Sequence, residues 1–391
     1  MSIAGDKMEE KDFGAQSQSF LTWFKSLPGS TFNDALSLED LRIHNAGRGI
    51  GELLRRVSIL DKRIPNPKHM LILNPVAKAD IPANTLLFTI PRAGVINITT
   101  SDLTKRLPQL FNNENLDATD DDLEASDSDP WLSLILVLIY EYLQGDESRW
   151  KPYFDVLPAE FDTPMFWPEE DIRELQASSV RSKIGKEDAD AMLAKKIIPT
   201  VKAHEDVFYP AGAPRLGDAE LLHLAHRMGS LIMAYAFDLD KDDENEEAEA
   251  EAEDGWVEDK DSTMLGMVPM ADILNSDAEF NVCMFGLTIS RAWDRLTTIQ
   301  AHVDHADEVL TVTSLREIRQ GEEVLNYYGP LANSDLLRRY GYVSHKHRRY
   351  DVVEIPQRLV GDKVQSAMGL SDAFKEKAVS FLQVLPNVAA F

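Results

Sequence analysis

The stretch NAGRGIGELLRR, residues 45–56, decides between two folds because it places Gly47, Gly49 and Gly51 at every second position. Glycines at this spacing let bare backbone pass close to a ligand, as in the nucleotide loop of a doubly wound enzyme. That loop must follow a buried apolar strand, and the preceding LSLEDLRIHNAG is a poor candidate for one. The glycines alone leave the question open, so the remainder of the chain has to answer it.

The order of the predicted elements indicates an α+β fold. Stretches with strand composition lie towards both ends of the sequence, TLLFTIPRAGVINI at 85–98 and EVLTVTSLREI at 308–318. Between them, helical patterns follow Pro130 and Gly217. The regular alternation of strand and helix that a doubly wound fold requires is missing, which disfavours the nucleotide-loop interpretation.

The helix that follows Pro130 is predicted to be wholly buried. Apolar residues from Trp131 to Leu143 cover almost every face, Asp129 can cap the helix, and proline suits its first position. The apolar run is too short for a bilayer, and no other run approaches the roughly 20 residues that a membrane span needs. We therefore expect no association with a membrane.

The net charge and the cysteine content limit the classes of partner and ligand that the sequence predicts. The 391 residues carry a net charge of -26, which disfavours direct binding to nucleic acid and favours a basic partner, although solubility alone also accounts for it. Two acidic segments without apolar periodicity, 112–129 and 238–262, are predicted to be disordered. Cys283 is the single cysteine and the histidines lack ligand spacing, so we expect no metal site.

Two segments in the C-terminal half are candidates for chemistry. They are MVPMADILNSD, residues 267–277, and GEEVLNYYGPLANSDLLRRYGYV, residues 321–343. Tyr328 precedes a Gly-Pro turn and Tyr340 lies on the predicted helix that follows, so both could line a polar pocket with Asn275. The composition alone favours the plainer interpretation, that these tyrosines are aromatic residues at the edge of a core.

Seven segments, taken together and in order, resemble SET-domain protein-lysine methyltransferases of the Rubisco large-subunit methyltransferase-like subgroup. The likeness is strongest to the fungal ribosomal-protein lysine methyltransferases and spans roughly residues 20–345. The segments are NAGRGIG, VAKADIPANTLLFTIPR, DPWLSLILVLIYE, RWKPYFDVLP, MAYAFDL, MVPMADILN and GEEVLNYYGPLANSDLLRRYGYV. In this family the Gly-x-Gly turn begins the SET fold close to S-adenosylmethionine (AdoMet), which answers the opening question.

The resemblance implies a SET-domain β-fold with a helical insertion and the start of a truncated helical substrate-binding domain. Two stretches, 51–75 and 287–306, are untypical of the family and are interpreted as insertions. The expected divisions are a disordered N-terminus at 1–19, SET segments at 20–111 and 263–344, a helical insert at 112–262 and the C-terminal start at 345–391.

The resemblance also implies the roles of individual residues. Tyr328 is the expected catalytic residue. The expected AdoMet-binding residues are Ala46, Gly47, Arg48, Gly49, Asn275, Ser276 and Tyr340. The expected substrate-binding residues are Trp131, Tyr235 and Asp238. Ser276 replaces the histidine that many relatives carry after the asparagine, so it lacks a ring that could cover the adenine.

The implied function is AdoMet-dependent methylation of a lysine on a basic protein, first of all a protein of the large ribosomal subunit and second a non-histone nuclear protein. We expect a monomer in the nucleus, with the cytoplasm as a further location. Two alternatives remain open: a catalytically inactive SET-fold module that binds basic proteins, and a Rossmann-type methyltransferase that uses residues 47–51.

Overall fold

The computed structural model describes residues 3–40, 73–111, 130–176, 178–240, 263–277, 280, 282–285, 309–353, 355, 359, 363, 366 and 367. Ala46, Gly47, Arg48 and Gly49 lie outside these residues, as do the acidic segment 112–129 and the stretch 287–306. The chain divides into two compact units, Met1–Arg349 and Tyr350–Phe391, which are described separately.

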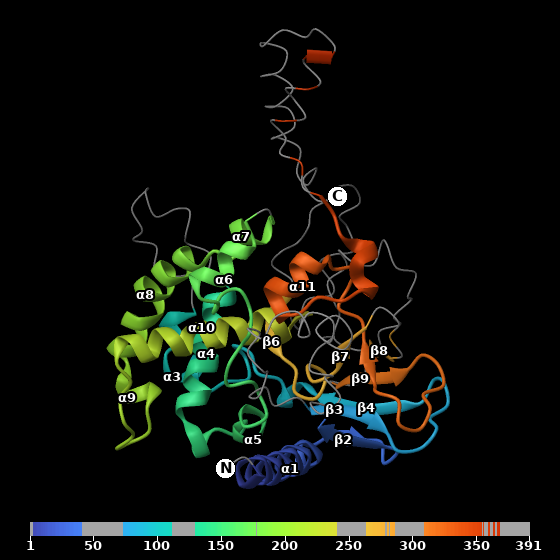
Figure 1. Cartoon of the computed structure of the whole chain (residues 1–391). Coiled ribbons are helices and arrows are strands. Elements are labelled where there is room, and N and C mark those ends of the chain that lie inside the picture. Colours follow the sequence, from blue (N-terminus) through green and yellow to red (C-terminus); the bar gives the residue numbers. More distant parts are fainter. Residues whose placement is uncertain are drawn as a thin grey trace, which may run out of the picture. The chain divides into compact units, whose positions relative to one another are not determined.

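The first unit combines strands with helices (Figure 1). Its strands are β1 Thr31–Phe32, β2 Leu36–Asp40, β3 Leu73–Ala77, β4 Leu86–Pro91, β5 Ala236–Asp240, β6 Thr263–Met267, β7 Asn275–Ser276, β8 Val282–Phe285, β9 Val309–Ser314 and β10 Leu325–Asn326. The α-helices are α1 Ile3–Ser26, α3 Leu103–Arg106, α4 Pro130–Leu143, α5 Lys151–Phe154, α6 Glu169–Glu174, α7 Val180–Lys183, α8 Lys186–Ala203, α9 Glu205–Phe208, α10 Asp218–Tyr235 and α11 Asn333–Tyr340.

The strands form several small sheets, and one of them joins the two ends of the sequence. Its order is β1-β4-β9-β8 with antiparallel neighbours, so β4 near the N-terminus pairs directly with β9 more than 200 residues later. The pairs β2–β3 and β5–β6 are antiparallel, whereas β7 and β10 run parallel. This arrangement confirms the α+β class expected from the strands at both ends.

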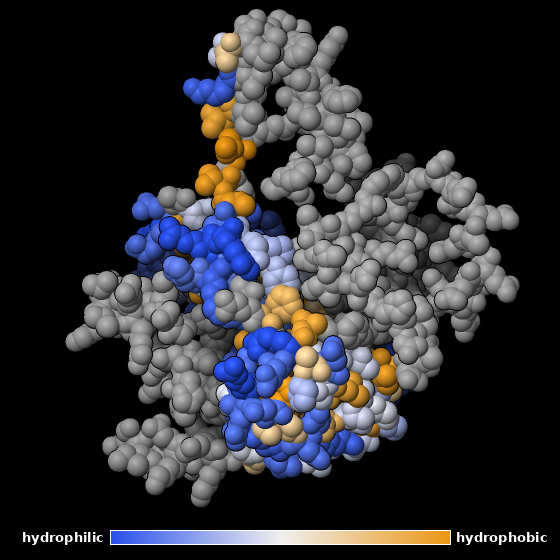
Figure 2. Space-filling view, turned by 90° about the vertical axis from the view of Figure 1, so that its right-hand side faces the viewer, coloured by the Kyte–Doolittle hydropathy of each residue, from blue (hydrophilic) through white to orange (hydrophobic). Residues whose placement is uncertain are grey.

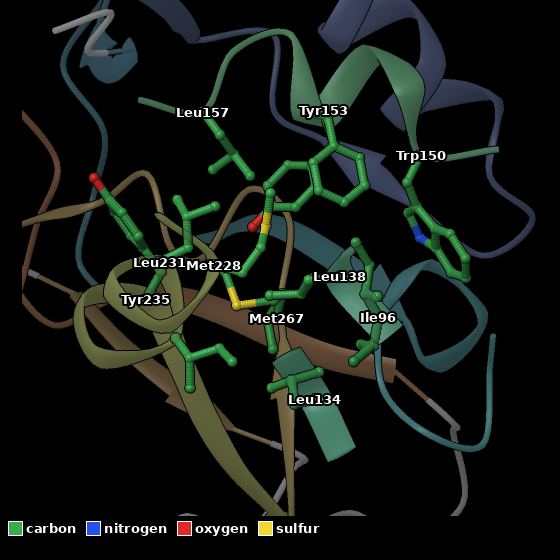
Figure 3. Close-up of a cluster of buried hydrophobic side chains, with 14 of the residues drawn as sticks. Ile96, Leu134, Leu138, Trp150, Tyr153, Leu157, Met228, Leu231, Tyr235 and Met267 are labelled. Atoms are coloured by element: carbon green, nitrogen blue, oxygen red, sulfur yellow. The ribbon is translucent and has the colours of Figure 1, made fainter. Parts of the chain in front are cut away.

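Helices between these strand regions form a block around α4, which contacts α8 and α10 (Figure 1). Residues Leu132 to Glu141 of α4 are all buried, as predicted, but the helix is not wholly buried, because Tyr142 near its C-terminal end has 38% of its surface exposed. Figure 3 shows Leu134 and Leu138 of α4 gathered with Met228 of α10 and Met267 of β6 in one apolar cluster. The strand β6 thus connects the helical block to the β-rich part of the unit.

Two expected boundaries differ from the structure. The sequence predicts disorder over residues 1–19, but α1 begins at Ile3, and its C-terminal half packs Phe20 and Phe24 into the core one helical turn apart. The acidic loop is expected to begin at Asp238, but β5 continues to Asp240 because Leu239 is buried and the strand pairs with β6.

The expected insertion 51–75 also ends inside an observed strand. Residues 73–75 belong to β3 and pair with Asp40, Glu39 and Leu38 of β2. The boundary is therefore too late by these three residues, while residues 51–72 lie outside the described part of the chain.

Apolar residues are exposed in the second unit. Val352, Val353 and Ile355 have 62%, 87% and 61% of their surface exposed, and apolar residues stand out at the top of Figure 2. In contrast, the described surface of the first unit is mostly hydrophilic on the face shown. Within the described residues, no helix has both the length and the apolar composition that a membrane span requires.

Gly341 ends α11 in a conformation that brings the helix against the helical block. It has φ +76°, in the left-handed region, and a Cβ at this position would overlap the carbonyl oxygen of Asp162. Only glycine meets both conditions.

We predict that Gly341→Ala lowers the free energy of unfolding by more than about 2 kcal/mol, because the left-handed conformation alone costs about 1 kcal/mol and the overlap adds to it. Gly212→Ala is the matched control, since Gly212 has φ +78° but open space around its Cβ position. Denaturant unfolding of both variants measures the difference, and equal losses would contradict the overlap.

Candidate active site

The candidate site is built where β7 and β10 run side by side. Leu325 pairs with Asn275 and Asn326 pairs with Ser276, which joins two segments that are 50 residues apart in the sequence. The backbone N–H of Asp277 also donates to the carbonyl of Asn326 at 3.1 Å. The two segments predicted to carry chemistry therefore meet.

Tyr328 is held directly against the segment that leads to Asn275. Its hydroxyl donates to the carbonyl oxygen of Leu274 at 2.6 Å, and its backbone N–H donates to the Oγ of Ser276 at 3.2 Å. The phenol thus has a fixed partner in the segment that leads to Asn275. Ser276 supports the backbone of Tyr328 in addition to any role towards a cofactor.

Three tyrosines form a contiguous aromatic cluster beside this bond. The ring centroids of Tyr328 and Tyr340 are 5.0 Å apart, and those of Tyr340 and Tyr342 are 6.1 Å apart. Tyr340 is the last residue of α11, and the Oδ1 of Asn333 accepts the backbone N–H of Ser344 at 2.7 Å across the turn after this helix. The structure therefore brings the two sequence-predicted tyrosines together.

Asn275 is buried, and its side chain contacts a glutamate that the sequence did not single out. The Nδ2 of Asn275 donates to the Oε1 of Glu323 at 2.6 Å. Glu323 lies two residues before β10, in the GEEVLNYYG segment, where its backbone bridges to Val76 of β3. The signal available in the sequence was only its position in the same segment as Tyr328.

The pKa of the Glu323 carboxyl is raised to about 7, chiefly by burial and to a smaller extent by the charge of Asp277, while the bond from Asn275 acts in the opposite direction. Asp277 is itself paired with Lys346, whose Nζ donates to Oδ1 at 2.8 Å. The site therefore holds a carboxyl group that is only partly ionised at neutral pH.

A buried contact supports the same segment from the helical block. The hydroxyl of Tyr153 in α5 donates to Oδ2 of Asp272, and both residues are buried. Asp272 precedes Asn275 by three residues, so the contact fixes the approach to the site. Sequence reasoning did not assign a role to either residue.

The three residues expected to contact substrate lie on the helical block and on β5. Trp131 lies in the first turn of α4 with its ring near Gly229 of α10, and Tyr235 is the last residue of α10. In Figure 3, Tyr235 stands at the edge of the apolar cluster with its hydroxyl directed away from it. Asp238 is exposed in β5, and partial desolvation raises the pKa of its carboxyl.

Of the predicted residues, Tyr328, Tyr340, Asn275 and Ser276 are brought into one connected group. Trp131 and Tyr235 share the contact between α4 and α10, and α10 also contacts α11, which carries Tyr340. The expected backbone contacts of Ala46, Gly47, Arg48 and Gly49 lie outside the described residues. Within the described ranges, no cluster of three or more His, Cys, Asp or Glu could hold a metal ion.

The chemistry of this group fits a cofactor with positive charge. A buried amide whose nitrogen is bonded to Glu323 offers its oxygen as an acceptor, and the carboxyl group behind it becomes more acidic when a cation approaches. AdoMet carries an ammonium and a sulfonium, so Asn275 and Glu323 fit it, with Tyr328 and Tyr340 supplying aromatic walls.

Comparison with known proteins points in the same direction. The chain is 27% identical over 384 residues to "Ribosomal lysine N-methyltransferase 4" of Saccharomyces cerevisiae, covering 97% of this chain and 66% of that protein. It is 29% identical over 273 residues to "N-lysine methyltransferase SETD6" of Homo sapiens, covering 68% of this chain and 47% of that protein. The chain thus spans less than two thirds of either relative. No family model matches the sequence.

The fold is also that of a solved structure, "Structure of Rubisco LSMT bound to AdoMet". The two superpose with a TM-score of 0.50 at 20% identity, over 84% of this chain and 57% of that chain. The resemblance to SET-domain protein-lysine methyltransferases and the SET-domain α+β fold are therefore confirmed.

We predict a pH dependence of stability from Glu323. Because its folded pKa, about 7, lies above the value of 4.5 for the free group, the ionised carboxylate is disfavoured in the folded state. The contribution of this group to stability is complete below pH 4.5 and is lost as the pH rises through 7. The loss amounts to up to about 3 kcal/mol.

Denaturant unfolding from pH 4 to 8 should show this fall in the free energy of unfolding for the wild type and not for Glu323→Gln. The control is Glu322→Gln, a substitution at the residue before Glu323. It removes a carboxylate that pairs with Arg316. A fall of the same size in Glu323→Gln would assign the titration to another group.

Proposed function

We propose that the chain is an AdoMet-dependent protein-lysine N-methyltransferase. The observation that carries the proposal is the bond of 2.6 Å from the Tyr328 hydroxyl to the carbonyl of Leu274, next to Asn275 and Ser276. This bond places a phenol oxygen against the segment that the family resemblance assigns to cofactor binding. The names of the yeast and human relatives support the same reaction for those proteins.

The reaction needs a neutral amine, a fixed line of attack and little water. Lysine titrates near 10.4, so only about one amine in a few thousand is neutral at pH 7. AdoMet, when bound, supplies an electrophilic methyl group. A cation beside the lysine and removal of water both favour the neutral amine, and the proton leaves to solvent before attack.

Tyr328 contributes orientation. Its hydroxyl proton is directed to Leu274, and we propose that its oxygen contacts the polarised methyl group or an N–H of the amine. Such alignment lowers the barrier by removing the entropy of finding the reactive geometry. Trp131 and Tyr235 are proposed to contact the lysine side chain, and their aromatic rings would attract its cation before deprotonation.

The proposed substrate is a lysine of a basic protein, first of all a ribosomal protein of the large subunit. One support is the name of the yeast relative, "Ribosomal lysine N-methyltransferase 4". The other is the net charge of -26, which attracts a cationic partner. A non-histone nuclear protein is the second candidate. We also propose that the protein is a monomer and that it acts in the nucleus.

A catalytically inactive module that binds basic proteins is the second candidate function. Ser276 in place of the family's histidine favours it, because the hydroxyl is occupied by the backbone of Tyr328 and a ring is absent. This alternative predicts binding to basic proteins without any transfer of methyl groups.

We predict that Tyr328→Phe lowers kcat for methyl transfer about a hundredfold or more, as for the loss of one fixed transition-state contact. The assay uses radiolabelled AdoMet with large-subunit ribosomal proteins. Tyr327→Phe is the matched control, because it removes the neighbouring hydroxyl and keeps the ring that stacks on Phe280 at 4.9 Å.

Transfer by the wild type that survives Tyr328→Phe would contradict the assigned role of the phenol. Transfer that is abolished by Gly49→Ala and spared by Tyr328→Phe would instead favour the Rossmann-type alternative. A wild type that binds the basic proteins and transfers no label would support the inactive module.

A further inference from the structure

We propose that a small cavity between α10 and α11 binds an acidic side chain of the protein substrate and so selects lysines that have an aspartate or glutamate nearby. The inference rests on the proposed function and adds a recognition site to it. Arg338 and Arg339 of α11, Ser230 of α10 and Thr163 line the cavity, and its other lining residues are apolar. Its volume of about 20 Å³ admits a group about as large as a water molecule, such as the tip of a carboxylate.

Both arginines of the cavity have a buried donor without an acceptor. The Nε of Arg338 and the Nε of Arg339 are each buried, and neither has a hydrogen-bond partner among the residues that the structure describes. A guanidinium N–H in this state has lost its bonds to water and gained none from the protein, which is unfavourable. A carboxylate oxygen in the cavity could accept from these groups, and the hydroxyls of Thr163 and Ser230 can donate to the same ligand.

The charges beside the cavity are mainly positive. Arg339 has no ion pair in the described ranges, and Arg338 has one with Asp335, whose Oδ1 lies 3.5 Å from the Nη2 of Arg338. Lys186 adds a third cation, because its Nζ donates to the carbonyl oxygen of Met165 in the cavity wall at 3.1 Å. Three cations with one paired carboxylate favour an anion in the cavity, although the whole chain has a net charge of -26.

The end of α11 holds two walls of the cavity together. Gly341 lets this helix approach the carbonyl oxygen of Asp162, the residue before Thr163. The carboxylate of Asp162 is engaged by a residue that does not line the cavity, since its Oδ1 accepts the Nε1–H of Trp167 at 2.8 Å. The helix also contacts α10 and α7, beside which it lies in Figure 1. The arginines are therefore carried by a packed helix, which lowers the entropy lost when a ligand binds to them.

The cavity is close enough to the candidate site for one short stretch of a substrate to reach both. Arg339 directly precedes Tyr340, whose ring centroid is 5.0 Å from that of Tyr328, and Ser230 lies on the helix that ends at Tyr235. The cavity and the Tyr328 phenol are thus separated by on the order of 15 Å, which an extended chain crosses in about four to five residues. An acidic residue within about five positions of the lysine can therefore reach the cavity.

A preference for a nearby acid would distinguish one lysine from the many others of a basic protein. The net charge of -26 attracts such proteins as a whole and does not choose among their lysines. The cavity adds the opposite local requirement, because a lysine flanked only by basic residues would place a cation beside Arg338 and Arg339. General attraction and local exclusion would then act together in substrate selection.

Acetate is the probe for the carboxylate site, because it carries the charged group and almost nothing else of an acidic side chain. Thermal unfolding of the full chain is measured in sodium acetate, sodium chloride and sodium phosphate at equal pH and ionic strength. We expect acetate to raise the Tm of the wild type by about 2 °C relative to chloride, as for a weak ligand at several times its Kd. The Tm of Arg339→Gln should not rise.

Arg173→Gln is the matched control for this measurement. It removes an exposed arginine of α6 that pairs with Glu169, so the response to acetate should remain. A rise with phosphate that Arg339→Gln abolishes, without a rise with acetate, would overturn the choice of a carboxylate. Equal Tm values of the wild type in acetate, chloride and phosphate would mean that the cavity holds water only, and would overturn the inference.

Substrate selection is tested with radiolabelled AdoMet and peptides that carry one lysine. At each position within about five residues of the lysine, Asp and Glu are compared with Asn and Gln, which have the same shapes and no charge. We expect the acid to raise kcat/KM about tenfold at one position, through KM, as for a charge-assisted hydrogen bond away from the reacting atoms. Arg339→Gln should lose this preference and Arg173→Gln should keep it.

Arg338→Gln is the second test variant, because it removes the other buried donor of the cavity, and it decides the outcome if Arg339→Gln does not fold. Equal kcat/KM for acidic and amide peptides in the wild type would overturn the inference and leave the proposed function intact, as would a preference that both variants retain. Absence of methyl transfer to every peptide and to ribosomal proteins would instead contradict the proposed function, and the inference with it.

Discussion

The candidate site depends on the parallel pairing of β7 with β10. Each strand has two residues, Asn275–Ser276 and Leu325–Asn326, and so small a ladder is not stable without support from other parts of the molecule. The bond from Tyr328 to the carbonyl of Leu274 lies at the end of this ladder and crosses between the same two segments. The phenol and the amide that are proposed to serve one reaction are thus positioned by one structural element.

Support for this pairing comes from both parts of the first unit. From the helical block, Tyr153 donates to Asp272 in the segment that leads to β7. In addition, α10 contacts α11, the helix that ends at Tyr340. From the β-rich part, Pro75 of β3 accepts the N–H of Val324 just before β10. A change in either part would therefore alter the site.

The sequence predicts those helices and site residues that depend on local composition or on a short motif. The helix at 130–143 is predicted because apolar residues cover almost every face, and Tyr328 because it lies in a family motif. The helix at 3–26 is not predicted, since its first residues are polar and its apolar contact is made by Phe20 and Phe24 at its far end. The pairing of Asn275 with Glu323 is missed because a two-residue parallel ladder has no periodicity to detect.

Glu141 and Glu323 both have a raised pKa, but their carboxyl groups contact different parts of the molecule. Glu141 in α4 accepts hydrogen bonds from Ser101 at 2.6 Å and from Ser148 at 2.7 Å, so both of its oxygens are bonded within the fold. Burial is the largest cause of the raised pKa of both carboxyl groups. At Glu141 two hydroxyl donors and Arg149 oppose the shift and Asp102 adds to it, whereas at Glu323 the amide of Asn275 opposes it and Asp277 adds to it. The carboxyl of Glu141 therefore holds parts of the helical block together, whereas that of Glu323 holds the amide of a residue in the candidate site.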